Sequence, residues 1–328
     1  MTLEIFIDGI LIHEGTYTAY GDPRNLTLQP MLINGSFPQD ISAKIIPLVM
    51  DFFPEEAVLN GWAYDDAIRD FPFRNGLPSQ LQNISDDGIF IHTDADEVVA
   101  REVLLFLKLH DNIPEPYIFN LKKTVYGFFW YSGEWQIHAG ATFGMMKNVF
   151  LMRPQFLRGN RYEKNTLVAK YLNSTPNAVL GPFSIGTVQH PAGYHCSYCT
   201  PPSGIRTKLI SAFNADFPRW GDYPMKCDLS YIESLIGKGM GFSETSCLSA
   251  CDSNQPNYAP AYILQNPKAF QYLLQNPYSN KNVSCNPDPK TSKGLYLKNW
   301  HRMSKAKFQE HMNQSHIVPP ENLLGILH

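Results

Sequence analysis

Short apolar runs and stretches with helical periodicity alternate along the first part of the chain. Residues 3–13 alternate apolar and polar positions at both ends, which is typical of a β-strand. The apolar run 44–53 has the length of a buried strand, although Pro47 must then lie where the sheet needs no hydrogen-bond donor. A further strand is expected over 89–92, directly after the turn formers at 86–88.

Two segments between these strands have the periodicity of helices. Residues 62–71 indicate a short helix, and 98–110 a longer one whose apolar face carries Val99, Val103, Phe106, Leu107 and His110. Two more strands are expected at 117–119 and 124–131. Strands and helices therefore alternate through residues 1–130, which predicts an α/β sheet. Further helices are expected at 205–213 and 228–237.

The composition limits the class of protein. Hydrophobic residues make up 44% of the 328, enough for a sizeable core. The formal net charge is −3, which argues against a nucleic-acid partner, because neutralising a phosphate backbone requires excess Lys and Arg. No apolar run has the length of a membrane helix, and the amino terminus lacks the basic region of a signal peptide. A soluble globular protein is expected, with one domain over residues 1–278 and a polar, mobile tail over 279–328.

Two residue patterns point to the secretory pathway. Six Asn-x-Ser/Thr triplets occur, more than chance predicts, which favours N-glycosylation, at Asn25, Asn34, Asn83, Asn173, Asn282 and Asn313. The chain also has six cysteines, an even number that suits full pairing in an oxidising compartment. The alternative is a cytosolic zinc site made of thiolates from Cys196, Cys199, Cys247 and Cys251.

The acidic tract after the strand at 89–92 carries the most chemistry. Asp94 and Asp96 are one residue apart at the carboxyl end of that strand, the edge at which open α/β sheets bind ligands. Carboxylates in this arrangement suit Mn²⁺ or Mg²⁺, which can bridge a protein to a diphosphate. The simpler interpretation is that the aspartates cap the following helix and that Glu97 complements its dipole.

This tract and several others resemble glycosyltransferase family 17. The resemblance spans residues 9–278, and its motifs lie at Thr18–Gly21, Gly61–Trp62, Asp65, Asp66, Arg69, His92–Glu97, Pro191–Cys199, Lys208–Ala212 and Asp216–Tyr223. It implies a GT-A-like mixed sheet flanked by helices, with an Asp-x-Asp metal site at a strand end. It further implies that Asp94 and Asp96 bind Mn²⁺ (or Mg²⁺) and the diphosphate of UDP-GlcNAc, with His195 as a third metal ligand. Glu14 and Arg69 are expected to contact the donor, UDP-GlcNAc.

The resemblance also implies the reaction. The expected activity is transfer of GlcNAc from UDP-GlcNAc to the core β-mannose of N-glycans in β-1,4 linkage, with inversion at the anomeric carbon. An inverting displacement needs one carboxylate to accept the acceptor proton, and the candidates are Asp216, Asp222 and Glu97. Two alternatives stay open: a transferase for another acceptor or donor, and a catalytically silent glycan-binding homologue.

Further candidates are less specific. Arg24, Lys122 and Lys123 could contact a diphosphate but are more commonly surface charges. Trp130, Trp135 and Trp220 could stack on sugar rings, although most tryptophans belong to the core.

The sequence departs from the family pattern at several points. Val98 and Val99 replace an Ile-Pro pair, and Tyr194 and Tyr198 replace two tryptophans. Family members are type II membrane proteins of the Golgi lumen. We expect this chain to start at the second strand of the domain, without the anchor and the first strand.

Overall fold

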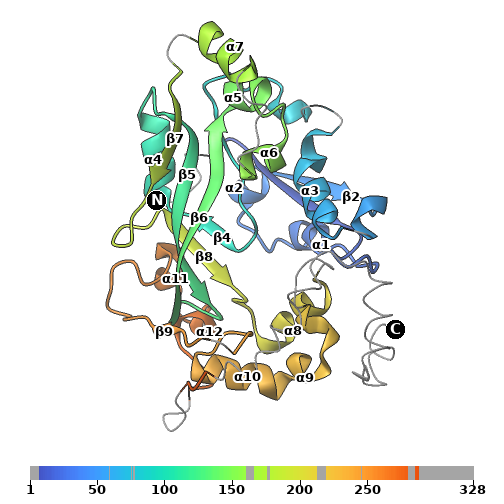
Figure 1. The fold of residues 1–328 in the computed structure, drawn as a ribbon, viewed down its shortest axis with the longest axis vertical. Helices are drawn as coiled ribbons and strands as arrows, with labels where there is room; N and C mark the ends of the chain where they lie inside the picture. The colour runs from blue at the N-terminus through green and yellow to red at the C-terminus, as the bar shows by residue number, and fades with distance from the viewer. Residues whose placement is uncertain are drawn as a thin grey trace.

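A computed structural model describes residues 7–58, 60–74, 76, 78–159, 166–175, 178–212, 219–244, 246–279 and 285–287. In this part of the chain a curled mixed sheet is flanked by helices (Figure 1). The mixed α/β class is therefore as expected. Asp216, Asn282, Asn313 and nearly all of the expected polar tail lie outside the described residues.

The main sheet has seven strands, in the order β3-β6-β5-β8-β4, with β7 paired to β5 and β9 to β6. Its strands are β3 (Ile89–Ile91), β4 (Glu97–Val99), β5 (Glu115–Val125), β6 (Trp130–Thr142), β7 (Leu180–Ile185), β8 (Gly193–Ser197) and β9 (Ser249–Ala250). The long strands β5 and β6 are antiparallel, whereas β7 and β8 run parallel to β5. Strand β4 is antiparallel to β8 and places Glu97 opposite His195.

Strands β1 (Ile10–Gly15) and β2 (Ile45–Met50) form a separate parallel pair. Both expected N-terminal strands therefore exist, but the first runs from Ile10 to Gly15 and does not include residues 7–9; residues 1–6 are not described. Pro47 lies opposite Ile12, and β2 pairs on this one side among the described strands. An edge strand tolerates proline because its outer side needs no donor.

Helices surround the sheet (Figure 1). Helix α5 lies toward one end of the long strands and α8 to α10 toward the other. The helices are α1 (Leu28–Ile33), α2 (Gln39–Ser42), α3 (Trp62–Asp70), α4 (Arg101–Leu109), α5 (Phe143–Asn148), α6 (Pro154–Arg158), α7 (Thr166–Ser174), α8 (Pro202–Ile210), α9 (Pro224–Cys227), α10 (Leu229–Lys238), α11 (Ala261–Gln265) and α12 (Gln271–Leu274). Short 3-10 helices lie at Glu55–Val58, Phe71–Phe73, Ser79–Leu81 and Trp220–Asp222.

Two differences from the sequence prediction concern the main sheet. The helix expected from residue 98 begins at Arg101, because Glu97–Val99 pair with β8. The two strands expected at 117–119 and 124–131 are wrong as separate elements. Residues Glu115–Val125 form one continuous strand, and β6 starts at Trp130 after a turn. Other strands pair with both edges of β5, and this pairing stabilises polar positions within the strand. The hydrophobic pattern alone indicates that the strand ends at those positions.

The cysteines form disulfides rather than a zinc site. Cys196 pairs with Cys199 and Cys247 with Cys285, so the proposed four-thiolate set does not form. The expected full pairing is also wrong, because Cys227 and Cys251 are free. These two residues pack in different hydrophobic clusters, Cys227 against Ile205 and Leu235 of helices α8 and α10, and Cys251 near Tyr258.

Thiol titration under denaturing, non-reducing conditions is expected to find two free thiols, and six after reduction, since two disulfides join the other four cysteines. Four or more thiols without reduction would contradict the pairing.

The four described sequon asparagines, Asn25, Asn34, Asn83 and Asn173, are all exposed. Each is therefore accessible to a glycosylating enzyme. Among the described helices, none combines the length and apolarity required to cross a membrane.

Candidate functional site

The acidic turn that follows β3 is fixed by backbone hydrogen bonds on both sides. The Glu97 N–H donates to the Asp94 carbonyl at 2.9 Å, and the Cys196 N–H donates to the Asp96 carbonyl at 2.9 Å. The Asp94 N–H in turn donates to Oε2 of Glu97 at 2.9 Å. Residues 93–96 are thereby held between the carboxyl end of β3 and the start of β4. The aspartates thus do not cap a helix, since α4 starts only at Arg101.

Asp94 faces two guanidinium groups. Arg69 of α3 contacts Oδ2 at 3.0 Å, and Arg158 at the end of α6 contacts it at 3.1 Å. Burial alone would raise the pKa of Asp94, but the charges of Arg69 and Arg158 outweigh it and lower that pKa below its usual value. Two buried donors near this carboxylate, Nε of Arg69 and Nη1 of Arg158, have no hydrogen-bond partner among the described residues. The site can therefore accept further negative charge.

Asp96 faces the other way, toward β8 and α8. Lys208 Nζ lies 2.9 Å from Oδ2, and His195 Nε2 lies 3.7 Å from Oδ1. Burial raises the pKa of Asp96, but the His195 ring and the Lys208 ammonium more than compensate and hold it well below its usual range. Asp96 therefore remains an anionic oxygen donor at neutral pH.

Glu97 is enclosed beneath these aspartates, with 1% of its side chain exposed. Its Oε1 accepts hydrogen bonds from Arg158 and from the indole of Trp135, the latter at 2.9 Å. The Trp135 ring also packs on His195, with centroids 4.8 Å apart, and Lys123 lies 4.5 Å above it. This indole is 37% exposed, so it presents one aromatic surface at the rim of the site.

Burial shifts the pKa of three titratable groups around the acidic turn. Burial lowers the pKa of His92, which follows β3, and of His13 on β1. Burial raises the pKa of Asp65 on α3 to about 6, even though Arg69 pairs with it. In this site the positive charges of Arg69, Arg158 and Lys208 are therefore paired with nearby carboxylates.

The donor set partly fits a divalent cation. Asp94, Asp96 and His195 come from one region, but the described residues contain no group of three His, Cys, Asp or Glu side chains close enough to hold a metal. Mg²⁺ and related ions are commonly held by one or two carboxylates, with substrate phosphates and water as the other ligands. Asp94 and Asp96 carry oxygen ligands of that kind, but they turn toward different partners, and His195 lies 3.7 Å from Asp96.

Other sequence candidates have different surroundings. Glu14 accepts hydrogen bonds from the N–H groups of Thr27 and Leu28 and from Arg24, so it organises the start of α1. Lys122 donates to the Asn257 carbonyl. Asp222 pairs with Arg219.

The three candidate tryptophans also differ in their surroundings. Trp130 donates to the Ile236 carbonyl and, like Trp220, packs with the cluster around α8 and α10. Of the three tryptophans, Trp135 is thus the one that the structure brings to the acidic turn.

Sequence reasoning missed two basic residues of this site. Lys208 lies within a stretch that matched the family, so its motif offered a signal. Arg158 belongs to none of the motifs found in the sequence. It contacts Asp94 and Glu97, which are more than 60 residues away along the chain, so only the fold identifies it.

Comparison with curated proteins finds close relatives. The chain is 42% identical over 274 residues to the beta-1,4-mannosyl-glycoprotein 4-beta-N-acetylglucosaminyltransferases of Rattus norvegicus, Mus musculus and Homo sapiens. The match covers 83% of this chain, and the chain spans about half the length of each relative. No family model and no solved structure matches. These homologues confirm the resemblance that the motifs indicated.

Proposed function

We propose that this chain, a homologue of the β-1,4-mannosyl-glycoprotein 4-β-N-acetylglucosaminyltransferases, transfers GlcNAc from UDP-GlcNAc to the core β-mannose of an N-glycan in β-1,4 linkage. The observation that carries this proposal is the 42% identity over 274 residues. The cluster of carboxylates and cations at the end of β3 supports it, since basic side chains pair with phosphate oxygens and carboxylates can hold a divalent cation that binds them. The exposed sequons and the disulfides support a location in the Golgi lumen.

The donor would bind at the acidic turn. Arg69 and Arg158 offer buried N–H groups to diphosphate oxygens, and Lys208 adds a third positive charge at the rim. Asp94 and Asp96 would hold Mn²⁺ or Mg²⁺, with His195 as the additional ligand. A bound cation of this kind neutralises charge on a departing phosphate. The GT-A-like arrangement of the sheet is part of the same proposal.

Acceptor activation needs a carboxylate that is not already neutralised. Glu97 accepts from Arg158 and Trp135, and Asp222 pairs with Arg219. Both contacts support Asp216, which lies outside the described residues, as the general base in preference to Asp222 or Glu97. Inversion follows from direct attack of the mannose hydroxyl on the anomeric carbon, since the donor is α-linked and the product β-linked.

Thermal unfolding tests donor binding separately from turnover. UDP-GlcNAc with Mn²⁺ is expected to stabilise the protein by about 2.7 kcal/mol at a hundredfold excess over Kd. Asp96→Asn should lose most of this stabilisation, whereas Asp216→Asn should keep it and yet fail to transfer sugar. Full stabilisation without turnover in the unmodified protein would favour a silent glycan-binding homologue, and no stabilisation at all would refute the donor site.

A further inference from the structure

Two motifs that are distant in the sequence meet in the structure. Tyr20 belongs to Thr18–Gly21, which follows β1, and Arg219 belongs to Asp216–Tyr223, which follows α8. The guanidinium of Arg219 lies 3.5 Å from the centroid of the Tyr20 ring. Arg219 is 4% exposed, and burial raises the pKa of Tyr20 to about 12, so the pair is largely shielded from water. A cation over an aromatic face attracts it more strongly when both are desolvated.

The loop that carries Tyr20 is held to helix α3. The Tyr64 hydroxyl of α3 donates to the Tyr17 carbonyl at 2.7 Å. Backbone hydrogen bonds close the same loop on itself and join its start to the end of β2. Tyr20 is thereby tied to α3, the helix from which Arg69 contacts Asp94.

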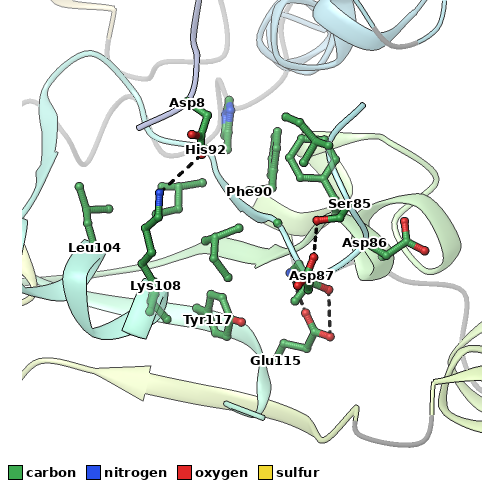
Figure 2. Close-up of a pocket in the computed structure, with 18 of the residues that line it drawn as sticks. Asp8, Ser85, Asp86, Asp87, Phe90, His92, Leu104, Lys108, Glu115 and Tyr117 are labelled. Carbon is green, nitrogen blue, oxygen red and sulfur yellow. Dashed lines mark hydrogen bonds and ion pairs between the residues drawn. The ribbon is translucent and has the colours of Figure 1, made fainter. Parts of the chain in front are cut away.

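Arg69 itself lies beside open space. It lines a cavity of about 1200 Å³, together with His92 and Glu97. Figure 2 shows this cavity, with His92 and Phe90 among the side chains drawn around it. Because Arg69 is not packed on this side, its placement depends on contacts made elsewhere by α3 and by the loop bonded to that helix.

Arg219 is held to the carboxyl end of helix α8. Its Nε donates to the Ala212 carbonyl at 2.9 Å, and its Nη2 donates to the Ile210 carbonyl. These carbonyls lie at the end of the helix, where backbone acceptors lack partners within the helix. Arg219 is thereby tied to α8, the helix from which Lys208 contacts Asp96.

The contact between the two motifs therefore links the two halves of the acidic turn. One half is the pair of Asp94 with Arg69. The other half is the pair of Asp96 with Lys208. A donor diphosphate and its cation would contact both halves at once, so the separation of the halves has to be fixed. A displacement of about 1 Å in such a site can lower the rate on the order of 100-fold.

We propose that Tyr20 and Arg219 form a clasp and act as positioning residues for the transfer reaction. The clasp would hold α8 at a fixed place relative to α3, and would thereby keep Lys208 at the working distance from the Asp94–Arg69 pair. Its two residues would act through Lys208 and not by touching the reacting atoms. This inference rests on the proposed function, because it concerns how the donor diphosphate is held.

Tyr20→Leu tests the clasp, because it removes the aromatic face and keeps an apolar side chain. It is expected to lower kcat/KM for GlcNAc transfer by on the order of tenfold. Tyr20→Phe keeps the ring and should stay within about threefold of the unmodified protein. Phe52→Leu is the matched control. It removes the ring that lies 4.9 Å from the Arg74 guanidinium, a contact of the same kind that does not involve α8, so turnover should not change.

A double-mutant cycle with Lys208 separates positioning from general structural damage. Tyr20→Leu, Lys208→Met and the double variant are compared by kcat/KM. If the clasp acts through Lys208, adding Tyr20→Leu to Lys208→Met should cost less than about twofold, because the group that the clasp positions is already gone. A merely structural role would instead produce the same loss in both backgrounds. If donor binds without turnover, the cycle is run on the Kd for UDP-GlcNAc with Mn²⁺.

Two results would overturn the clasp: Tyr20→Leu as active as the unmodified protein, or losses from Tyr20→Leu and Lys208→Met that multiply in the double variant. Arg219→Lys enters the same cycle if Tyr20→Leu does not fold. Lysine keeps the charge but lacks the planar fork that bonds both α8 carbonyls, so the same pattern is expected. Failure of the unmodified protein to bind UDP-GlcNAc is a different result, since it refutes the proposed function and the clasp with it.

Discussion

Replacing Asp94 or Asp96 by Asn is expected to lower kcat/KM for GlcNAc transfer by about 10²- to 10³-fold. Asn keeps the shape of each side chain but removes the charge that would hold the cation. Asp94→Asn also removes one of the carboxylate partners of Arg69 and Arg158, which keep Asp65 and Glu97 respectively, while Asp96→Asn removes the partner of Lys208.

The matched control is Asp86→Asn, which breaks an exposed ion pair with Lys147. Its effect on turnover should be small, because exposed pairs contribute little. The three variants are compared by their initial rates of UDP release at several Mn²⁺ concentrations. Turnover near that of the unmodified protein in either Asp94→Asn or Asp96→Asn would show that the acidic turn is not the donor site.

Replacing Arg158 by Met is expected to lower the free energy of unfolding by about 3–5 kcal/mol and to reduce transfer strongly. The Glu97 carboxylate is almost fully enclosed, and Arg158 is its cationic partner. Without that partner a buried charge is uncompensated, because the two remaining donors, the Trp135 indole and the Asp94 N–H, carry no positive charge. The same change removes one of two guanidinium groups that would face the diphosphate.

Arg153→Met is the control for Arg158→Met. Arg153 precedes the same short helix, but it pairs with Asp70 and is 46% exposed, so its loss should cost no more than about 1 kcal/mol. Urea unfolding of both variants provides the comparison. Adding Glu97→Gln to Arg158→Met should recover part of the lost stability, because the buried charge is then gone. An Arg158→Met protein as stable as the unmodified one would contradict the account of Glu97.

The local sequence predicted those elements in which the order of apolar and polar residues follows from which face is buried. Helix α3, strand β3 and the position of the aspartates after it followed from periodicity and turn residues. The helix start at Arg101 did not, because pairing between β4 and β8 overrides the helical periodicity of residues 98–100. The continuity of β5 was also missed, since the partners along its other edge, β7 and β8, lie far away in sequence.

The site shows the same limit. The Asp-x-Asp spacing and the position of His195 near aromatic residues could be found in the sequence, because each motif is local. The sequence could not show that Asp94 faces Arg69 and Arg158 while Asp96 faces Lys208. These contacts join segments that are distant in sequence.

The most direct test of the central claim is incubation with UDP-GlcNAc, Mn²⁺ and a biantennary N-glycan, read by mass spectrometry and linkage analysis. The account predicts one added N-acetylhexosamine, β-1,4-linked to the core β-mannose, and none with Asp96→Asn. A product linked elsewhere would assign another acceptor, and unchanged glycan in the presence of donor that binds would contradict the transfer activity.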